Sequence, residues 1–137
     1  FKQEDFALTH PGGSLGRRLL LSVKDEMITQ NLPFVNKNGT MKEVVLKMTE
    51  SRLGLALIGN EEKLEGIITD GDLRRSLLMS DDFTKIEIKD ILNKSPMTAY
   101  ENDNLQVAHE RMKEARLQSL VVKNNDEKIV GVIQIFK

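Results

Sequence analysis

An internal repeat with a period of about 65 residues constrains the fold of this chain more than any other feature. The offset is 64 residues between Met41 and Leu105 and 65 between Gly66 and Gly131, as expected when one connecting loop gains a residue. The repeated pieces are Lys24-Asp25 with Lys89-Asp90, Arg52-Leu53 with Arg116-Leu117, and Leu64-Glu65-Gly66-Ile67-Ile68 with Ile129-Val130-Gly131-Val132-Ile133. Two half-domains that share one core are therefore predicted.

Length and charge indicate one compact unit without nucleic-acid chemistry. A chain of 137 residues lies in the range of a single domain and buries roughly two-thirds of its surface. Charged residues make up 30% of the chain and nearly cancel, to a net charge of −1. Because no long basic stripe is present to neutralise phosphates, we expect no nucleic-acid partner.

The remaining composition excludes several other classes. The chain has no cysteine and two histidines, so neither a disulfide framework nor a thiolate metal site is available, and the histidines lack metal-ligand spacing. No apolar run approaches the roughly 18 residues that a membrane helix needs, and no signal peptide opens the chain. A cytoplasmic protein without membrane contact is expected, and the start at Phe1 suggests a piece of a longer one.

Hydrophobic periodicity predicts the same elements in both repeats. In the first, residues 32–35 read as an extended segment, and apolar residues of 41–48 follow the spacing of an amphipathic helix. Two short strands, 55–58 and 65–68, precede a helix expected over 73–79. The second repeat reproduces this order with a helix from Leu105 and strands at 120–122 and 130–135, after which the chain stops. The prediction is an α/β (α+β) fold of two β-α-β-β-α repeats, the second lacking its last helix.

This order, with Gly66-Ile67-Ile68-Thr69-Asp70-Gly71-Asp72-Leu73 at the last strand-to-helix turn, resembles a tandem pair of CBS domains. The lead-in His10-Pro11-Gly12-Gly13-Ser14-Leu15-Gly16-Arg17-Arg18-Leu19-Leu20 is similar to the junction segment of sugar isomerase (SIS) proteins of the arabinose 5-phosphate isomerase family. The resemblance implies a linker over 1–23 from a missing sugar isomerase domain, a first CBS domain over 24–80 and a truncated second over 88–137.

Thr69 and Asp72 are the candidate ligand-binding pair. They flank a helix N-terminus, where unpaired N–H groups favour an anion. Thr69 would donate to a phosphate oxygen, Asp72 would accept the hydroxyls of a ribose, and Arg74 or Arg75 would neutralise the phosphate. The alternative is a capping box, because each side chain can satisfy the other residue's backbone N–H. The two roles are compatible.

The second repeat departs from this pattern, since Gln134 and Lys137 stand in the places of Thr69 and Asp72. A second site of the same kind is therefore not expected. Apolar residues would contact a base in the cleft between the repeats, although such residues more often belong simply to a core. These candidates are Leu32, Phe34, Leu55 and Leu57.

His10 is the one candidate for catalysis. Pro11 keeps it out of a helix, and an ordinary pKa near 6.5 suits proton transfer. The family resemblance implies that this histidine reaches the active site of the missing isomerase domain, whereas spacing alone favours an ordinary linker histidine. Gly12, Gly13 and Gly16 do not form a phosphate loop, because Arg17-Arg18 stands where lysine and a hydroxyl residue are needed.

The resemblance implies a regulatory or oligomerisation module of an arabinose 5-phosphate isomerase, which interconverts D-ribulose 5-phosphate and D-arabinose 5-phosphate for lipopolysaccharide or capsule biosynthesis. The parent would need no cofactor, and this piece alone would not catalyse. A regulatory nucleotide such as AMP, ATP or a cytidine sugar nucleotide is an implied ligand. Homo-oligomers are implied as well, a dimer of CBS pairs and a tetramer in the parent. The alternatives are a nucleotide sensor of another sugar-phosphate isomerase and a ligand-free dimerisation platform.

Overall fold

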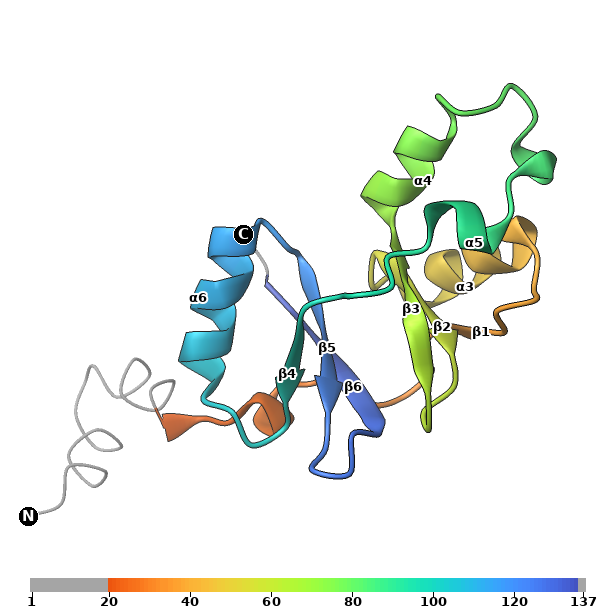
Figure 1. Cartoon of the computed structure of the whole chain (residues 1–137). Coiled ribbons are helices and arrows are strands. Elements are labelled where there is room, and N and C mark those ends of the chain that lie inside the picture. The colour runs from red at the N-terminus through yellow and green to blue at the C-terminus, as the bar shows by residue number, and fades with distance from the viewer. Residues whose placement is uncertain (1–19, 136–137) are drawn as a thin grey trace, which may run out of the picture.

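The first repeat of the sequence folds as a three-stranded sheet with two helices. The computed structural model of the chain describes residues 20–135. Strand β1 (Phe34–Val35) lies parallel to β2 (Leu55–Gly59), which pairs antiparallel with β3 (Leu64–Thr69). Helix α3 (Met41–Ser51) connects β1 with β2, and α4 (Asp70–Ser76) follows β3 directly. The predicted β-α-β-β-α order is confirmed for this repeat (Figure 1).

The second repeat has the same topology. Strand β4 (Thr98–Tyr100) is parallel to β5 (Ser119–Lys123), and β5 is antiparallel to β6 (Ile129–Gln134), with α6 (Leu105–Ala115) between β4 and β5. The described residues end at Ile135, one residue after β6. Two small sheets with helices against them confirm the mixed α/β fold class.

Local chemistry places the helix ends. The side chains of Thr40 and Asn104 accept hydrogen bonds at the N-termini of α3 and α6, as N-cap residues do. Both helices end at an arginine in the left-handed region, Arg52 and Arg116, each with φ of 59°, so the recurring arginine has the same backbone conformation in both repeats. Helix α4 differs from the prediction: it begins at Asp70 rather than near Leu73 and ends at Ser76, because Thr69 caps it directly at the end of β3.

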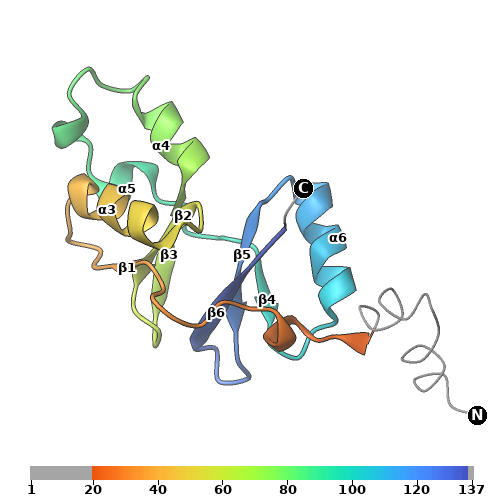
Figure 2. The same ribbon diagram turned by 180° about the vertical axis from the view of Figure 1, so that it is seen from behind.

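The segment that precedes each repeat packs on the other repeat. Helix η1 (Val23–Asp25) and the residues after it reach β6, where Ile28 and Val132 exchange backbone hydrogen bonds of 2.8 and 3.0 Å. In the same way, η2 (Phe83–Lys85) and α5 (Ile88–Ile91) remain beside the first repeat. Figures 1 and 2 show the orange lead-in beside β4, β6 and α6, and α5 beside β3 and α3. The halves are therefore interleaved.

Three buried clusters result from this exchanged packing, in which the segment before each repeat lies on the other repeat. Ile88 belongs to the core of the first sheet, although it opens the second repeat in sequence, and Val23 belongs to the core of the second. A third cluster lies between the two sheets and joins the repeats. Its buried members are Leu53, Leu55, Leu57, Ile67, Val121, Ile129 and Val132.

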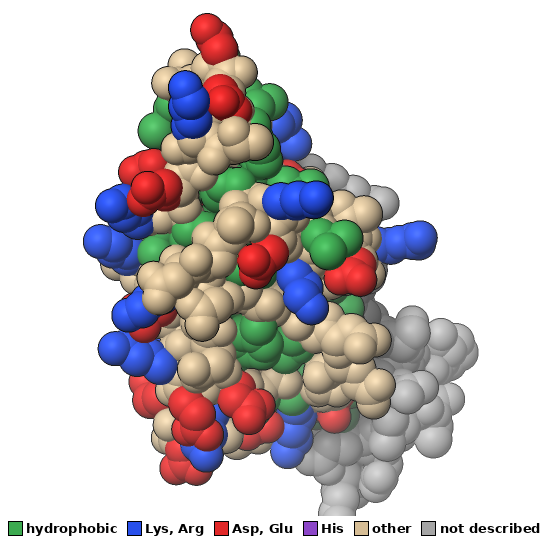
Figure 3. All heavy atoms as spheres, turned by 90° about the vertical axis from the view of Figure 1, so that its right-hand side faces the viewer, with side chains coloured by type: hydrophobic (Ala, Val, Ile, Leu, Met, Phe, Trp, Pro, Cys, Tyr) green, Lys and Arg blue, Asp and Glu red, His purple; other side chains and the backbone are tan. Residues whose placement is uncertain are grey.

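The outer face of the first repeat carries charges of both signs. In Figure 3, lysine and arginine side chains stand next to acidic ones, and hydrophobic side chains show between them. This mixture agrees with the net charge of −1. Over residues 20–135, no helix is both long and apolar enough to cross a bilayer.

Candidate functional site

A cleft between the two repeats is lined by several of the residues predicted for the site, namely Leu55, Thr69, Asp72 and Arg74. It is a cavity of about 550 Å³, large enough for a small ligand. One wall is the turn from β3 into α4, and the other is the loop from α6 to β5, with the segment before β4 closing one side. The lining residues are Gly54, Leu55, Ile67, Thr69, Asp70, Gly71, Asp72, Arg74, Arg75, Asn93, Met97, Ala115, Arg116, Leu117, Gln118 and Ser119.

Thr69 and Asp72 form a complete capping box on this wall. Thr69 N donates to Asp72 Oδ2 over 2.9 Å, and Asp72 N donates to Thr69 Oγ1 over 3.2 Å. Each side chain thus satisfies a backbone N–H at the start of α4. The capping alternative is present in the structure. Both side chains also line the cleft, so the same two residues can contact a ligand there while they cap the helix.

The two arginines of this wall differ in their partners. Arg75 Nη2 donates to Asp72 Oδ1 over 2.6 Å, an ion pair in which the Arg75 side chain is 70% exposed and that of Asp72 only 19%. Arg74 lines the same cleft and is exposed. Asp72 therefore uses both carboxylate oxygens, one for the cap and one for Arg75.

The structure brings only part of the predicted apolar set to the cleft. Leu55, at the start of β2, lines it. Leu32 and Phe34 do not line it; they pack, half-buried, against the cluster between the sheets, and Leu57 is buried within that cluster. The reason is the exchanged arrangement, which places the segment before β4, and not the one before β1, beside Thr69.

The loop from α6 to β5 and the segment before β4, which together face the Thr69 turn, consist of second-repeat residues that the sequence analysis did not assign to the site. Met97 and Leu117 supply apolar surface, and Arg116 and Gln118 supply polar groups. Ser119 Oγ donates to the Leu53 carbonyl oxygen over 2.5 Å, a hydrogen bond from the second repeat to the first. The repeat offset could have drawn attention to Arg116, because it stands in the place of Arg52. Nothing in the sequence, however, shows which loop of one repeat faces the Thr69 turn of the other.

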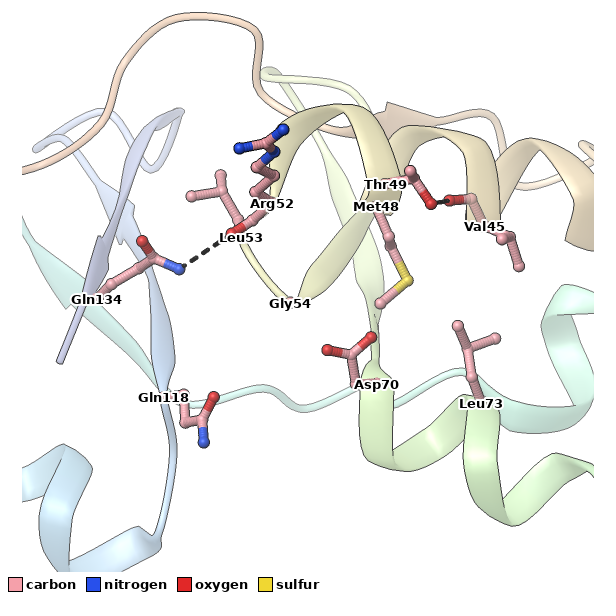
Figure 4. A pocket seen from close by; sticks show the side chains of 10 residues that line it. All are labelled: Val45, Met48, Thr49, Arg52, Leu53, Gly54, Asp70, Leu73, Gln118 and Gln134. Atoms are coloured by element: carbon pink, nitrogen blue, oxygen red, sulfur yellow. Dashed lines mark hydrogen bonds between the residues drawn. The ribbon is translucent and has the colours of Figure 1, made fainter. Parts of the chain in front are cut away.

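A smaller cavity of about 390 Å³ adjoins the cleft and shares Gly54, Asp70 and Gln118 with it. Figure 4 shows the side chains of Gln118 and Gln134, from the second repeat, on one side of it and Asp70, from the first repeat, on the other. Gln134 Nε2 donates to the Arg52 carbonyl oxygen over 3.5 Å. Gln134 thus contacts the first repeat and does not line the cleft that holds Thr69.

Two predicted residues lie outside the described range, namely His10 and Lys137. Within residues 20–135, no group of three or more histidine and acidic side chains is placed to hold a metal ion. In the described cleft, Thr69 and Asp72 can therefore form hydrogen bonds with a ligand, and the arginine side chains can form ion pairs with an anionic group.

A family model described as the CBS domain matches the chain twice, over residues 23–79 and 88–135. These matches together cover more than half of the 137 residues.

Curated relatives match almost the whole chain. The probable arabinose 5-phosphate isomerase of Haemophilus influenzae is 42% identical over 135 residues, 98% of this chain and 40% of that protein. Arabinose 5-phosphate isomerase KpsF of Escherichia coli is 38% identical over 137 residues, 99% of this chain and 42% of that protein. The chain thus spans less than half the length of these relatives.

Solved structures share the fold. The CBS domain protein PAE2072 from Pyrobaculum aerophilum, complexed with AMP, superposes with a TM-score of 0.73 at 23% identity, covering 83% of this chain and 87% of that chain. At this identity the likeness concerns the fold alone.

Proposed function

The chain belongs to the CBS domain family, and from that premise we propose that it is a nucleotide-binding regulatory module of an arabinose 5-phosphate isomerase. The parent would interconvert D-ribulose 5-phosphate and D-arabinose 5-phosphate in the cytoplasm. Identities of 42% and 38% to proteins of that name, across nearly all of the chain, support this parent. In it, residues 1–23 would be the linker, with 24–80 and 88–137 as the two CBS domains.

The single observation that carries the ligand proposal is the grouping of Thr69, Asp72 and Arg74 on one wall of the 550 Å³ cleft. A carboxylate accepts hydrogen bonds from the two hydroxyls of a ribose, and a hydroxyl and a guanidinium bind phosphate oxygens. The ligand class is therefore a nucleotide. The AMP in the similar Pyrobaculum protein supports an adenine nucleotide first, with ATP and cytidine nucleotides as further candidates.

The base would lie toward apolar side chains from both repeats. Leu55 and Ile67 belong to the first sheet, and Met97 and Leu117 face them from the second repeat. Ligand sites are commonly lined in this way, with apolar contacts for a planar ring and a few polar groups that fix orientation. A ligand held between the walls would couple the relative position of the repeats to nucleotide concentration.

Calorimetric titration of the 137-residue chain with AMP, ATP and CMP tests this function. We expect one site per chain, lost in Asp72→Ala because the ribose acceptor is removed. Gln134→Ala is the matched control: it alters the equivalent turn of the second repeat and should leave the affinity nearly unchanged. Two equivalent sites, or equal losses from both substitutions, would contradict the one-site proposal.

His10 is proposed to act in the parent enzyme only, as a residue that assists proton transfer. In the full-length protein, His10→Ala should lower turnover about a hundredfold, whereas the 137-residue chain should not convert ribulose 5-phosphate. Measurable conversion by this chain alone would overturn the assignment.

A ligand-free dimerisation platform is the second candidate. It is favoured by the complete capping box at Thr69 and by exposed apolar side chains on α3 and after α4, namely Leu46, Leu77, Leu78 and Met79. A dimer of CBS pairs, and a tetramer in the parent, would cover such surface, and two-fold dimers are the commonest closed assemblies. Sedimentation equilibrium at micromolar concentration checks this, and a purely monomeric chain would rule the platform out.

A further inference from the structure

We propose that the ion pair between Asp72 and Arg75 is an internal competitor for the ligand, so that the cleft selects molecules carrying both a vicinal diol and a phosphate. The inference rests on the proposed nucleotide function. In it, the ribose hydroxyls take the place of Arg75 at Asp72, and the released guanidinium pairs with the phosphate of the same ligand.

The geometry at Asp72 makes the two partners alternatives. Oδ2 is held inside the turn, where it accepts from Thr69 N over 2.9 Å. Oδ1 accepts from Arg75 Nη2 over 2.6 Å. Because Oδ2 is engaged by Thr69 N, Oδ1 is the oxygen that a ligand in the cleft would use. A carboxylate oxygen can accept two hydrogen bonds, but only 19% of the Asp72 side chain is exposed, so a ribose and the guanidinium compete for the same space, and the diol would move Arg75 away.

Within residues 20–135, surrounding atoms do not hold the Arg75 side chain in place once its bond to Asp72 is broken. This side chain is 70% exposed, and it bends back from the third residue after Asp72 to lie against Gly71. A Cβ atom built at Gly71 would lie 3.2 Å from Arg75 Nη1 and 3.6 Å from Nη2. The glycine therefore leaves room for the folded-back guanidinium, and a methyl group there would push aside only the end of a flexible side chain.

Displacement has a different cost for different ligands. A charge-assisted hydrogen bond is stronger than a neutral one, so a nucleoside that replaces Arg75 with a hydroxyl gains little. A nucleotide replaces the same bond and then gives the guanidinium a phosphate to pair with inside the cleft. The competition for Asp72 lowers the affinity for both ligands alike, and only AMP gives the released guanidinium a new partner. Arg75 therefore favours AMP over adenosine through the phosphate contact.

Titration of wild type, Arg75→Gln and Arg74→Gln with adenosine and with AMP tests the exchange. Breaking a largely exposed ion pair changes an affinity by up to about fivefold. In Arg75→Gln, adenosine should bind up to about fivefold more tightly, because nothing competes for Asp72. AMP loses the same competitor but also its phosphate partner, so the ratio of AMP affinity to adenosine affinity should fall. Gly71→Ala, which disturbs the folded-back guanidinium, should also tighten adenosine binding.

Arg74→Gln is the matched control because Arg74 lines the same cleft but makes no ion pair with Asp72 within residues 20–135. It can weaken AMP binding, but it should not tighten adenosine binding. If Arg75→Gln weakens adenosine and AMP by the same factor, or changes neither, the competitor role is wrong. If wild type binds neither compound, the nucleotide function itself fails, and this inference fails with it.

Discussion

The backbone of Asn93 lies directly over Gly66. Asn93 exchanges two backbone hydrogen bonds of 3.0 Å with Ile67, and a Cβ atom built at residue 66 would collide with the Asn93 carbonyl oxygen. The other repeat has the same arrangement, in which Ile28 pairs with Val132 and its carbonyl oxygen lies 2.8 Å from a Cβ atom built at Gly131. A glycine at this position of each sheet thus allows the backbone of the segment before the other repeat to approach the strand closely.

Gly66→Ala should lower the free energy of unfolding by about 2–3 kcal/mol, because the obstructing atom is backbone and the segment before β4 would have to shift. Gly131→Ala should cost less, since Met27 Sδ and the Ile28 carbonyl, at 3.0 and 2.8 Å, leave more room. Urea unfolding measures both. Glu65→Ala, one residue away on the partly exposed side of β3, is the control, and a Gly66→Ala variant as stable as this control would contradict the account.

The exchanged packing predicts which residues are energetically coupled. Val23 and Leu105 lie in the same buried cluster, although 82 positions separate them. Val23→Ala should destabilise the chain by about 2 kcal/mol, and its effect should be non-additive with that of Leu105→Ala by at least about 0.5 kcal/mol.

A matched cycle supplies the control for this coupling. Val44 lies in the core of the first sheet, so Val23→Ala and Val44→Ala should be additive within about 0.5 kcal/mol. The opposite pattern, with coupling between Val23 and Val44 and none between Val23 and Leu105, would show that the lead-in packs on its own repeat.

Periodicity and the repeat were sufficient to predict the order of elements and the fold class, because strand and helix patterns are local properties of the sequence. The exchange was not predicted. It depends on backbone pairing between Ile28 and Val132 and between Ile67 and Asn93, and a backbone hydrogen bond leaves no mark on side-chain type. The recurring Gly66 and Gly131, which allow the close approach, were a sequence signal of it.

The same limit applies to the candidate site, which the sequence could predict only in part. Thr69, Asp72 and Arg74 form one local turn, so sequence could group them, and the structure places all three on the cleft. Leu32 and Phe34 were assigned to the site from their own repeat, whereas the cleft draws its second wall from Met97 and the loop at Arg116. Which loop faces the turn is a tertiary property that follows from the interleaved halves.

The capping box makes a separate prediction for stability without ligand. Thr69→Ala removes the acceptor for Asp72 N and should lower the free energy of unfolding by about 1 kcal/mol. Thr69→Ser keeps a hydroxyl at the same place and should cost clearly less. Thermal and urea unfolding of both variants decide this, and equal losses would mean that the Thr69 methyl group matters rather than its hydroxyl.

Tyr100 offers a clean spectroscopic test of the second repeat, because it is the single tyrosine of the chain. A hydrogen bond to the Glu127 side chain raises the pKa of the Tyr100 hydroxyl above its ordinary value of 10.0, and partial desolvation and the charges of Glu127 and Asp103 act in the same direction. A raised pKa in the folded state means that this interaction stabilises the fold fully below pH 10.0 and is lost as the pH rises through the folded value.

Ultraviolet titration of tyrosinate absorbance should therefore give a midpoint above 10.0, and Glu127→Gln should lower that midpoint because it removes the negative charge. A wild-type midpoint at or below the ordinary value, or one that Glu127→Gln leaves unchanged, would show that Glu127 does not hold the Tyr100 proton.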